Sequence, residues 1–241
     1  MAKFLTELAE IRARYSRRRV SDYGYWQKQF DQHSLREREF RFASILNNKI
    51  ENFDNISVLE VGAGNGRNLQ FFHRMGVPWY NITANELLVE RVANLKQLLP
   101  DLRIIPGDAM DIDPANGKFD VILLSAVFTS ILDEDFRFAL ASHTLNLLTA
   151  TGFILWYDFC YNNPWNPDVR RVRLTELGSL FPSTIIEYSS VTLAPPLGRF
   201  VGPLYPLVNK IPWLRTHIVA CISPCGAEHA PAIFRSSRRG S

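Results

Sequence analysis

A short apolar run followed by alternating glycines carries the most chemical information in this sequence. Residues 58–69 read VLEVGAGNGRNL, with Glu60 two residues before Gly62 and further glycines at Gly64 and Gly66. The apolar run predicts a buried strand. The glycines predict a turn in which φ can be positive and a ligand can lie directly against the main chain. This pattern indicates a nucleotide-like ligand beside the turn.

The glycine spacing separates two classes of cofactor. The dinucleotide fingerprint G-x-G-x-x-G places its third glycine three residues after the second, and Arg67 stands there. The segment has instead the form E-x-G-x-G-x-G, which resembles motif I of the class I S-adenosylmethionine-dependent methyltransferases. In that family the turn holds the methionine and ribose parts of a cationic cofactor, which a carboxylate at Glu60 would suit. A glycine-rich turn without a ligand is the alternative interpretation.

Two further acids follow the next two predicted strands. Glu86 resembles the family's ribose acid, whose oxygens can accept from both ribose hydroxyls, although an acid in the first turn of a helix would also explain it. Asp108, in Pro-Gly-Asp-Ala, resembles the residue that accepts from the adenine amino group. The resemblance thus implies S-adenosylmethionine as cofactor, bound by Glu60, Gly62, Ala63, Gly64, Asn65, Gly66, Glu86, Leu87, Asp108, Ala109 and Ser125.

The elements that must position these residues alternate along the chain. Strands are expected near 56–61, 79–84, 102–106, 119–125, 153–158, 184–193 and 217–222, and helices near 67–76, 87–98, 134–148 and 173–181. Such alternation predicts βαβ units and a mostly parallel sheet covered on both faces. By resemblance the fold is an α/β, Rossmann-like, seven-stranded methyltransferase sheet of order 3-2-1-4-5-7-6, with the last strand antiparallel.

The two ends of the chain read differently from its centre. Residues 3–19 have helical periodicity, and Ser34 with Glu37 has the form of a capping box that begins a second helix. We therefore predict a helical cap over 1–52, a methyltransferase domain over 53–225 and a disordered tail over 226–241. The aromatic residues Tyr23, Tyr25, Trp26 and Phe30, between the two helices, could close over a ligand or pack against the core.

The acceptor side is less clearly marked. Ser125-Ala126-Val127-Phe128, after the fourth strand, does not match the Asn/Asp-Pro-Pro-aromatic motif of related enzymes that methylate amino groups of nucleobases and of glutamine. Methyl transfer is an in-line displacement, and a base is needed only for a weak nucleophile. We expect Asp158 to be a general base toward a hydroxyl and His33 to be a second candidate. Tyr157, Asn162 and Asn163 would orient the acceptor, and Arg170 would meet a negative group.

Each of these acceptor-side residues has a structural alternative. The asparagines could shape a proline-rich turn that Asp158 caps, and His33 could be a surface histidine. The prediction is O-methylation of a small molecule or glycan hydroxyl, with a weak similarity to methyltransferases of bacterial polysaccharide synthesis. Methylation of a nucleic acid or protein is one alternative, if the basic residues at 12–19 lie beside the cofactor. A non-catalytic partner protein is another.

Composition and charge set wider bounds. The chain has 241 residues, 21% of them charged and 46% hydrophobic, with a net charge of +3, which predicts one soluble globular domain and makes nucleic acid an unfavoured partner. The three cysteines form no C-x-x-C pair, and no apolar run reaches a membrane-spanning length, so a reduced, cytoplasmic protein is expected. No metal is implied. The apolar, proline-broken stretch 193–214 could be a substrate lid, a dimer contact, an edge cover or a shallow membrane-facing surface.

Overall fold

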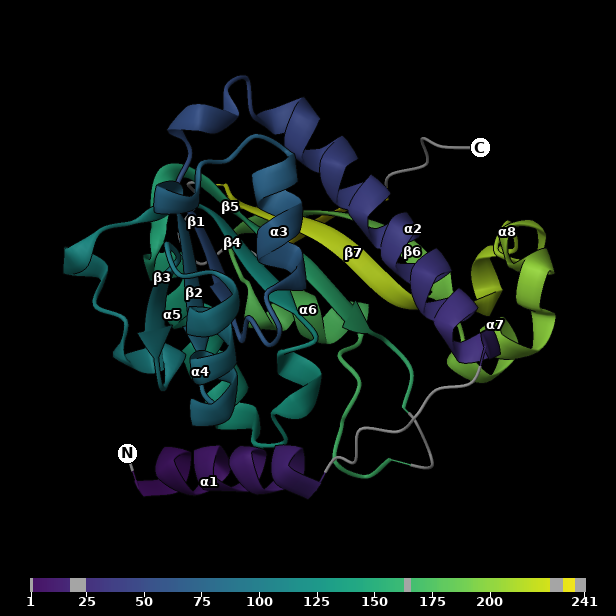
Figure 1. The fold of residues 1–241 in the computed structure, drawn as a ribbon, viewed down its shortest axis with the longest axis horizontal. Coiled ribbons are helices and arrows are strands. Elements are labelled where there is room, and N and C mark those ends of the chain that lie inside the picture. The colour runs from purple at the N-terminus through teal and green to yellow at the C-terminus, as the bar shows by residue number, and fades with distance from the viewer. Residues whose placement is uncertain (1, 18–24, 163–165, 226–231, 237–241) are drawn as a thin grey trace.

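One mixed sheet forms the centre of the molecule (Figure 1). The computed structural model describes residues 2–17, 25–162, 166–225 and 232–236. Within these residues the strand order is β3-β2-β1-β4-β5-β7-β6-β8, and β7 runs antiparallel to both of its neighbours. The predicted order 3-2-1-4-5-7-6 is thereby confirmed. The strands are β1 (Val58–Val61), β2 (Ile82–Glu86), β3 (Arg103–Pro106), β4 (Phe119–Ser125), β5 (Leu148–Phe159), β6 (Thr184–Leu193), β7 (Arg215–Pro224) and β8 (Ile233–Ser236).

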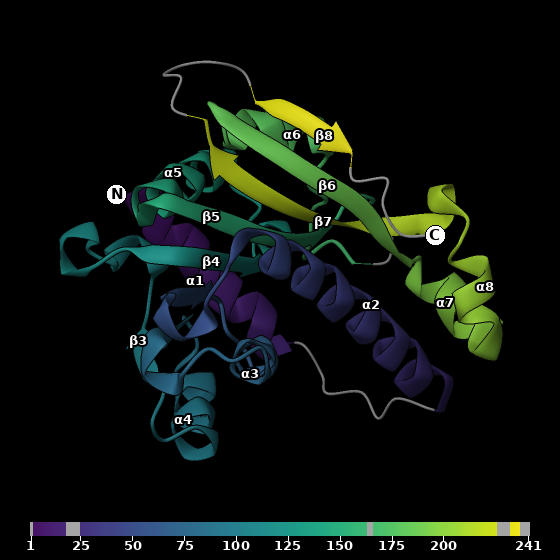
Figure 2. The same ribbon diagram turned by 90° about the horizontal axis from the view of Figure 1, so that it is seen from above.

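Helices cover both faces of this sheet, as Figure 2 shows from a second direction. Alternate residues of β4 enter two separate apolar cores, because successive side chains of a strand point to opposite faces. The second, third and fourth helices pack on one face, and the first, fifth and sixth pack on the other. The helices are α1 (Ala2–Arg17), α2 (Tyr25–Lys49), α3 (Arg67–Arg74), α4 (Val89–Leu98), α5 (Glu134–Asn146), α6 (Leu174–Leu180), α7 (Pro195–Val201) and α8 (Tyr205–Val208).

The start of α2 corrects one sequence-based prediction. The helix begins at Tyr25, nine residues before the predicted cap at Ser34. Ser34 lies inside the helix, where its hydroxyl donates to the carbonyl of Asp31 at 3.1 Å rather than capping an end. Phe30, from the aromatic group ahead of it, is buried, so the packing alternative holds for that residue. Tyr23 lies outside the described residues.

The carboxyl-terminal tail contains an eighth strand that the sequence analysis did not predict. β8 pairs in parallel with β6, and Ile185 is the partner of Ile233. The prediction of a disordered tail is therefore wrong for residues 233–236, which extend the sheet by one edge strand. Thr184–Leu193, the strand that receives it, was predicted with the correct bounds.

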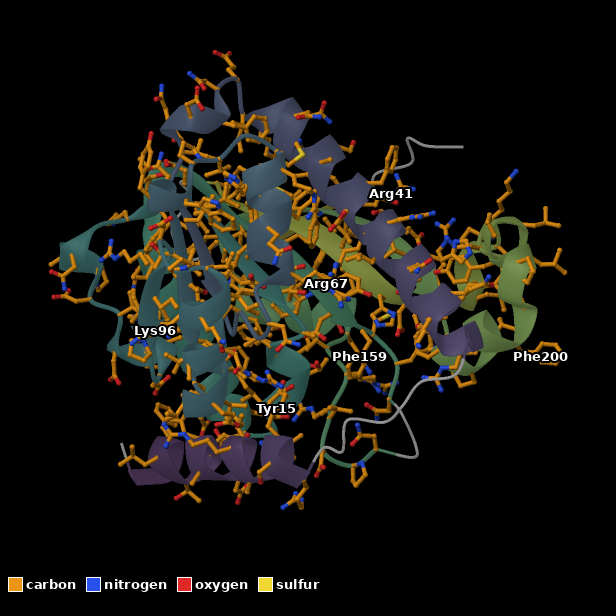
Figure 3. All side chains as sticks on the ribbon, in the orientation of Figure 1. Tyr15, Arg41, Arg67, Lys96, Phe159 and Phe200 are labelled. Atoms are coloured by element: carbon orange, nitrogen blue, oxygen red, sulfur yellow. The ribbon has the colours of Figure 1, made fainter. Side chains whose placement is uncertain are left out.

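A helical lobe connects β6 to β7 at the carboxyl edge of the sheet. It contains α7, α8 and two short 3-10 turns, and it projects beyond the sheet in Figure 1. Its inner side packs on α2 through Phe30, Leu193 and Tyr205, while Phe200 points outward from its far end (Figure 3). None of the described helices combines the length and apolar character needed to cross a bilayer. Cys160, Cys221 and Cys225 form no disulfide with one another.

Candidate cofactor and acceptor site

The glycine turn joins β1 to α3 through three residues with positive φ. Gly62, Gly64 and Gly66 have φ of +67°, +58° and +72°. A Cβ on Gly66 would approach Leu95 Cδ2 to 2.8 Å, so close packing of α3 against α4 requires glycine there. A Cβ on Gly64 would meet nothing nearer than Arg91 Nη1 at 3.8 Å. Space is therefore open beside Gly64, whose amide donates to Glu86, while Gly62 is the glycine of the turn that lines the cavity described below.

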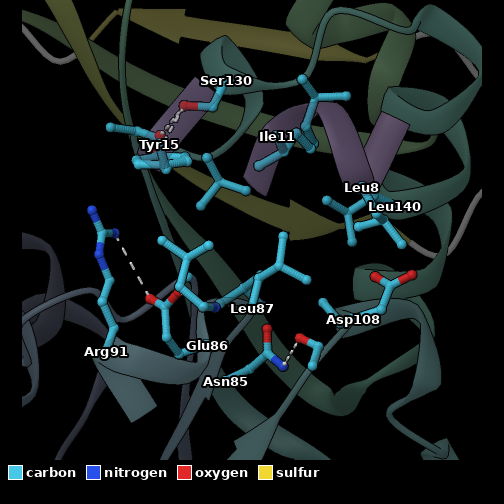
Figure 4. Close-up of a pocket in the computed structure, with 18 of the residues that line it drawn as sticks. Leu8, Ile11, Tyr15, Asn85, Glu86, Leu87, Arg91, Asp108, Ser130 and Leu140 are labelled. Atoms are coloured by element: carbon cyan, nitrogen blue, oxygen red, sulfur yellow. Dashed lines mark hydrogen bonds and ion pairs between the residues drawn. The ribbon is translucent and has the colours of Figure 1, made fainter. Parts of the chain in front are cut away.

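Glu86 ties the end of β2 to this turn. Its Oε2 accepts from the Gly64 amide at 2.7 Å and its Oε1 accepts from the Leu88 amide at 2.9 Å. Arg91 Nη1 lies 4.0 Å from Oε2, the ion pair drawn in Figure 4. The side chain is 3% exposed and faces a cavity. Each carboxylate oxygen keeps a second lone pair, so this geometry leaves room for hydroxyl donors.

Glu60 stands on the other side of the turn with one oxygen unpaired. Its Oε1 accepts from Asn68 Nδ2 at 2.6 Å, and Asn68 Oδ1 accepts from Arg38 Nη2 at 2.9 Å. Glu60 Oε2 is buried without a hydrogen-bond partner in the described part of the chain. Burial raises the pKa of Glu60 to about 8, against the lowering effects of Asn68 and Arg38. A buried, unpaired carboxylate oxygen beside a glycine turn suits a cationic ligand group.

A cavity of about 200 Å³ lies along the carboxyl ends of β1, β2, β3 and β4 (Figure 4). Asp108 lines it and uses Oδ1 to accept from the Met110 amide at 3.0 Å; burial raises the pKa of this carboxyl. The other predicted cofactor residues that line the cavity are Gly62, Glu86, Leu87, Ala109 and Ser125. The remaining ones, Glu60, Ala63, Gly64, Asn65 and Gly66, lie around the adjoining turn and do not line the cavity.

Helix α1, within the segment 1–52 that is predicted to be a helical cap, lies over this cavity. Leu8, Ile11 and Tyr15 line the cavity from α1, and the Tyr15 hydroxyl lies 2.9 Å from Ser130 Oγ. Arg14 is 5% exposed, pairs with Glu7 at 2.7 Å and donates to the Ser130 carbonyl at 3.1 Å. The helical spacing of these residues predicts an apolar face, but nothing in the sequence names the surface that this face covers.

Tyr157 and Asp158, predicted to act together, point to opposite faces of the sheet because they are consecutive on β5. The Tyr157 ring lies between the Arg38 guanidinium, 4.8 Å from its centroid, and the His217 ring, stacked at 5.2 Å. Burial raises the pKa of Tyr157, and burial followed by the charge of Arg38 lowers the pKa of His217 to about 4. His33 lies elsewhere, stacked on Tyr205 at 5.0 Å. The structure thus does not bring the three predicted catalytic residues together.

Asp158 is 2% exposed and makes three hydrogen bonds. Oδ1 accepts from Thr129 Oγ1 at 2.6 Å and from the Phe159 amide at 3.0 Å, and Oδ2 accepts from the Thr129 amide at 3.1 Å. Burial raises the pKa of Asp158 to about 7, despite these hydrogen bonds and the positive charge of Arg137. Asp158 does not line the cavity itself, but its partner Thr129 precedes Ser130, which does.

The predicted substrate residues border a second cavity of about 510 Å³, between α5, α6 and the segment that follows β5. Asn162 and Arg170 both line it, and Asn163 lies outside the described residues. Arg170 Nη2 is 2.8 Å from a Glu134 oxygen and 3.0 Å from a Glu176 oxygen. The negative groups that Arg170 meets within the chain are therefore these two glutamates.

The sequence and the fold match known proteins. Residues 58–152, which contain the glycine turn, Glu86 and Asp108, match the family model described as a methyltransferase domain. The chain is a class I S-adenosylmethionine-dependent methyltransferase. The methyltransferase is similar in fold to magnesium protoporphyrin IX methyltransferase from Synechocystis PCC 6803, with bound S-adenosylhomocysteine. The TM-score is 0.60 at 12% identity, over 90% of this chain and 94% of that one.

Other solved methyltransferases share the fold. The plantazolicin methyltransferase BpumL, in complex with S-adenosylhomocysteine and a desmethylplantazolicin analogue, gives a TM-score of 0.59 at 13% identity over 92% and 98% of the two chains. The 1,6-didemethyltoxoflavin-N1-methyltransferase of Burkholderia thailandensis gives 0.55 at 18% identity over 78% of each. Among curated proteins none matches this sequence. The matches named here lend no support to the similarity with polysaccharide-synthesis enzymes.

The residues of the methyltransferase fit S-adenosylmethionine. The unpaired Oε2 of Glu60 suits the cofactor's cationic methionine end. Glu86 and Asp108 both line the cavity with their carboxylates, which can accept hydrogen bonds from a polar ligand. The Gly64 amide ties Glu86 to the glycine turn.

Proposed function

We propose that this methyltransferase transfers a methyl group to a hydroxyl of a small molecule or glycan. The observation that carries the proposal is the carboxyl edge beside the cofactor cavity. β4 there ends in Ser125 without the prolines that amino-group methylation uses, and β5 presents a buried carboxylate at Asp158. The relatives act on their own acceptors, named as toxoflavin and plantazolicin precursors and magnesium protoporphyrin, which favours a small acceptor over a macromolecule.

Each cofactor residue then has a defined task. Glu86 would hold the ribose hydroxyls, Asp108 the adenine amino group and Glu60 the ammonium group. S-adenosylmethionine supplies an electrophilic methyl group when it is bound. Leu8 and Ile11 of α1 would exclude water from the cavity, so the acceptor oxygen competes with little solvent.

Asp158 is our candidate for the group that takes the hydroxyl proton. Its pKa of about 7 is matched to a base that works near neutral pH. Thr129, its hydrogen-bond partner, is the neighbour of a cavity-lining serine, so a movement of the 128–130 turn away from β5 would open the Asp158 carboxylate to the cavity. The same hydrogen bonds suit a residue that only positions the turn, and the following experiment separates the two roles.

Asp158→Asn and Thr129→Val should be compared in a methylation assay. If Asp158 is the base, Asp158→Asn lowers kcat by about a hundredfold or more. Thr129→Val removes a hydrogen bond that lowers the pKa of Asp158, so it should shift the pH–rate profile to higher pH and keep most of the activity at its optimum. If Thr129→Val instead loses as much activity as Asp158→Asn with no shift in the profile, Asp158 only positions the turn.

The acceptor class is open to a direct screen. Transfer of a tritiated methyl group from S-adenosylmethionine should be measured over glycan, phenolic, nucleic-acid and protein fractions. We expect incorporation in the glycan or phenolic fraction. Incorporation confined to nucleic acid or protein would contradict the proposal. The basic residues at 12–19 give little support to a nucleic-acid or protein acceptor. Arg14 forms ion pairs with Glu7 and Glu10, and Arg17 lies 3.3 Å from Asp168.

A further inference from the structure

The lobe between β6 and β7, residues 194–214, exposes large apolar side chains on its outer side. Phe200 is 88% exposed and Trp213 is 80% exposed, and Leu204 and Leu207 are 59% and 63% exposed. Side chains of this size are normally covered, and here four of them belong to one segment of about twenty residues. Figure 3 shows Phe200 at the far end of the lobe, pointing away from the rest of the chain.

These residues are not needed to hold the lobe together. The inner side of the lobe has its own contacts, because Gly198 lies against the Phe30 ring and Tyr205 is 2% exposed. Glu37 of α2 anchors it further, accepting from the Tyr205 hydroxyl at 3.1 Å and from Asn209 Nδ2 at 2.8 Å. Phe200 on α7, Leu207 on α8, and Leu204 and Trp213 on the two 3-10 turns are thus left to solvent by this packing, and we call them together the outer face of the lobe.

The charged side chains of the lobe, Arg199 and Lys210, are both positive. No aspartate or glutamate occurs between Glu187 and Glu228, so the whole lobe is free of acids. Arg199 and Lys210 are exposed on it, and neither side chain has a hydrogen bond or ion pair within the described part of the chain. Glu37 of α2, an acid that contacts the lobe, is on its inner side and is held by its hydrogen bonds. The outer face therefore combines exposed Trp, Phe and Leu with uncompensated positive charge.

We propose that the outer face of the lobe docks on a lipid bilayer that carries anionic headgroups. Tryptophan and phenylalanine partition to the boundary between headgroups and acyl chains, and Arg and Lys are attracted by anionic lipid. The same positive charge disfavours pairing with a second copy of the lobe. The lobe also projects from the molecule in Figures 1 and 2, a convex shape that can enter an interface. Since β6 ends and β7 begins at the carboxyl edge, docking holds that edge beside the membrane surface.

Vesicle sedimentation of the full chain tests this docking. The protein should sediment with phosphatidylglycerol-containing vesicles at low salt and much less with pure phosphatidylcholine, and added salt should release it. The double variant Phe200→Ser/Trp213→Ser and the double variant Arg199→Gln/Lys210→Gln should each bind the anionic vesicles at least about tenfold more weakly. The matched control is Tyr80→Ser, which removes an aromatic side chain that is 78% exposed next to the amino end of β2.

Binding of S-adenosylmethionine by each variant shows that the fold is intact and keeps this test separate from the proposed function. Failure of the wild-type protein to sediment with anionic vesicles would overturn the docking proposal. So would equal sedimentation of Phe200→Ser/Trp213→Ser and wild type. Analytical ultracentrifugation without lipid tests whether the outer face is a contact between two copies of the chain. A wild-type dimer that Phe200→Ser/Trp213→Ser dissociates would also overturn the docking proposal.

Discussion

At the carboxyl edge of the sheet, the cofactor site and the junction of α2 with the lobe are held by different kinds of contact. On the cofactor side Glu86 bonds to Gly64 and Leu88, at sequence separations of 22 and 2, and Asp108 bonds to Met110 at a separation of 2. At the junction of α2 with the lobe, Glu37 accepts from Thr192 and Asn209, at separations of 155 and 172. The cofactor site is made within successive βα units, and the junction joins distant parts of the chain.

This difference has a functional consequence. A cofactor site made of turns and strand ends follows from short motifs and changes little when other segments vary. An acceptor site that includes α2, the segment after β5 and the lobe would change with each of them. Substitutions on the cofactor side should therefore affect the binding of S-adenosylmethionine, and substitutions on the acceptor side should leave it intact.

The largest expected effect is that of Gly64→Arg. The substitution forces arginine to a φ of +58° and directs its side chain toward the guanidinium of Arg91, into the space that a ligand would occupy. The dissociation constant for S-adenosylmethionine, measured by calorimetry, should rise at least about a hundredfold. Gly117→Arg is the control, because Gly117 also has a positive φ, +124°, with nothing within 4 Å of its Cβ. Equal loss in both variants would mean that backbone strain alone is responsible.

Glu60→Gln should have an intermediate effect that depends on pH. The wild-type carboxyl must be ionised to meet a cation, and its raised pKa of about 8 makes binding improve as pH rises from about 6 to 8. In the variant this dependence should be lost and affinity should fall by about tenfold at pH 8. At each pH the dissociation constant of Glu60→Gln is divided by that of wild type. Titration of groups on S-adenosylmethionine affects both constants equally and so does not change this ratio. A ratio that does not change with pH would exclude Glu60 as the cation's partner.

The same carboxyl should influence stability without any ligand. Because folding raises the pKa of Glu60 from 4.5 to about 8, the folded state holds its proton more tightly. Its contribution to the free energy of unfolding is present in full below about pH 4.5 and is lost as pH rises through 8. Thermal unfolding of wild type should show this decline, and Glu60→Gln should show less of it. Parallel curves would contradict the assigned cause.

Arg170→Gln should have the smallest effect and should spare the cofactor. Its partners Glu134 and Glu176 are partly exposed, so loss of these ion pairs should cost about 1 kcal/mol or less of unfolding free energy. The dissociation constant for S-adenosylmethionine should change by less than about twofold. A large loss of cofactor affinity would show that the cofactor side and the acceptor side are coupled through the 128–131 turn.

Much of the fold could be predicted because it follows from local pattern. The strand Phe119–Ser125 and the βα alternation around it follow from periodicity, whereas the start of α2 does not, since Ser34 and Glu37 imitate a cap inside a continuous helix. Glu37 has instead a tertiary role, anchoring the lobe through Tyr205. A capping motif and a buried anchor use the same residue types, and only the packing of α2 against the lobe distinguishes them.

The sequence by itself indicated the methyl donor, through the resemblance of the turn after Val61 and the acids at Glu86 and Asp108 to the family's motifs, and these residues converge because they follow successive strands of one sheet. Tertiary structure alone decided which side chains of α1 line the cavity, that Tyr157 and Asp158 face opposite sides of the sheet and that Arg170 is paired with glutamates. These contacts join segments that no local pattern relates, since their energies depend on burial and on partners brought together only when the chain folds.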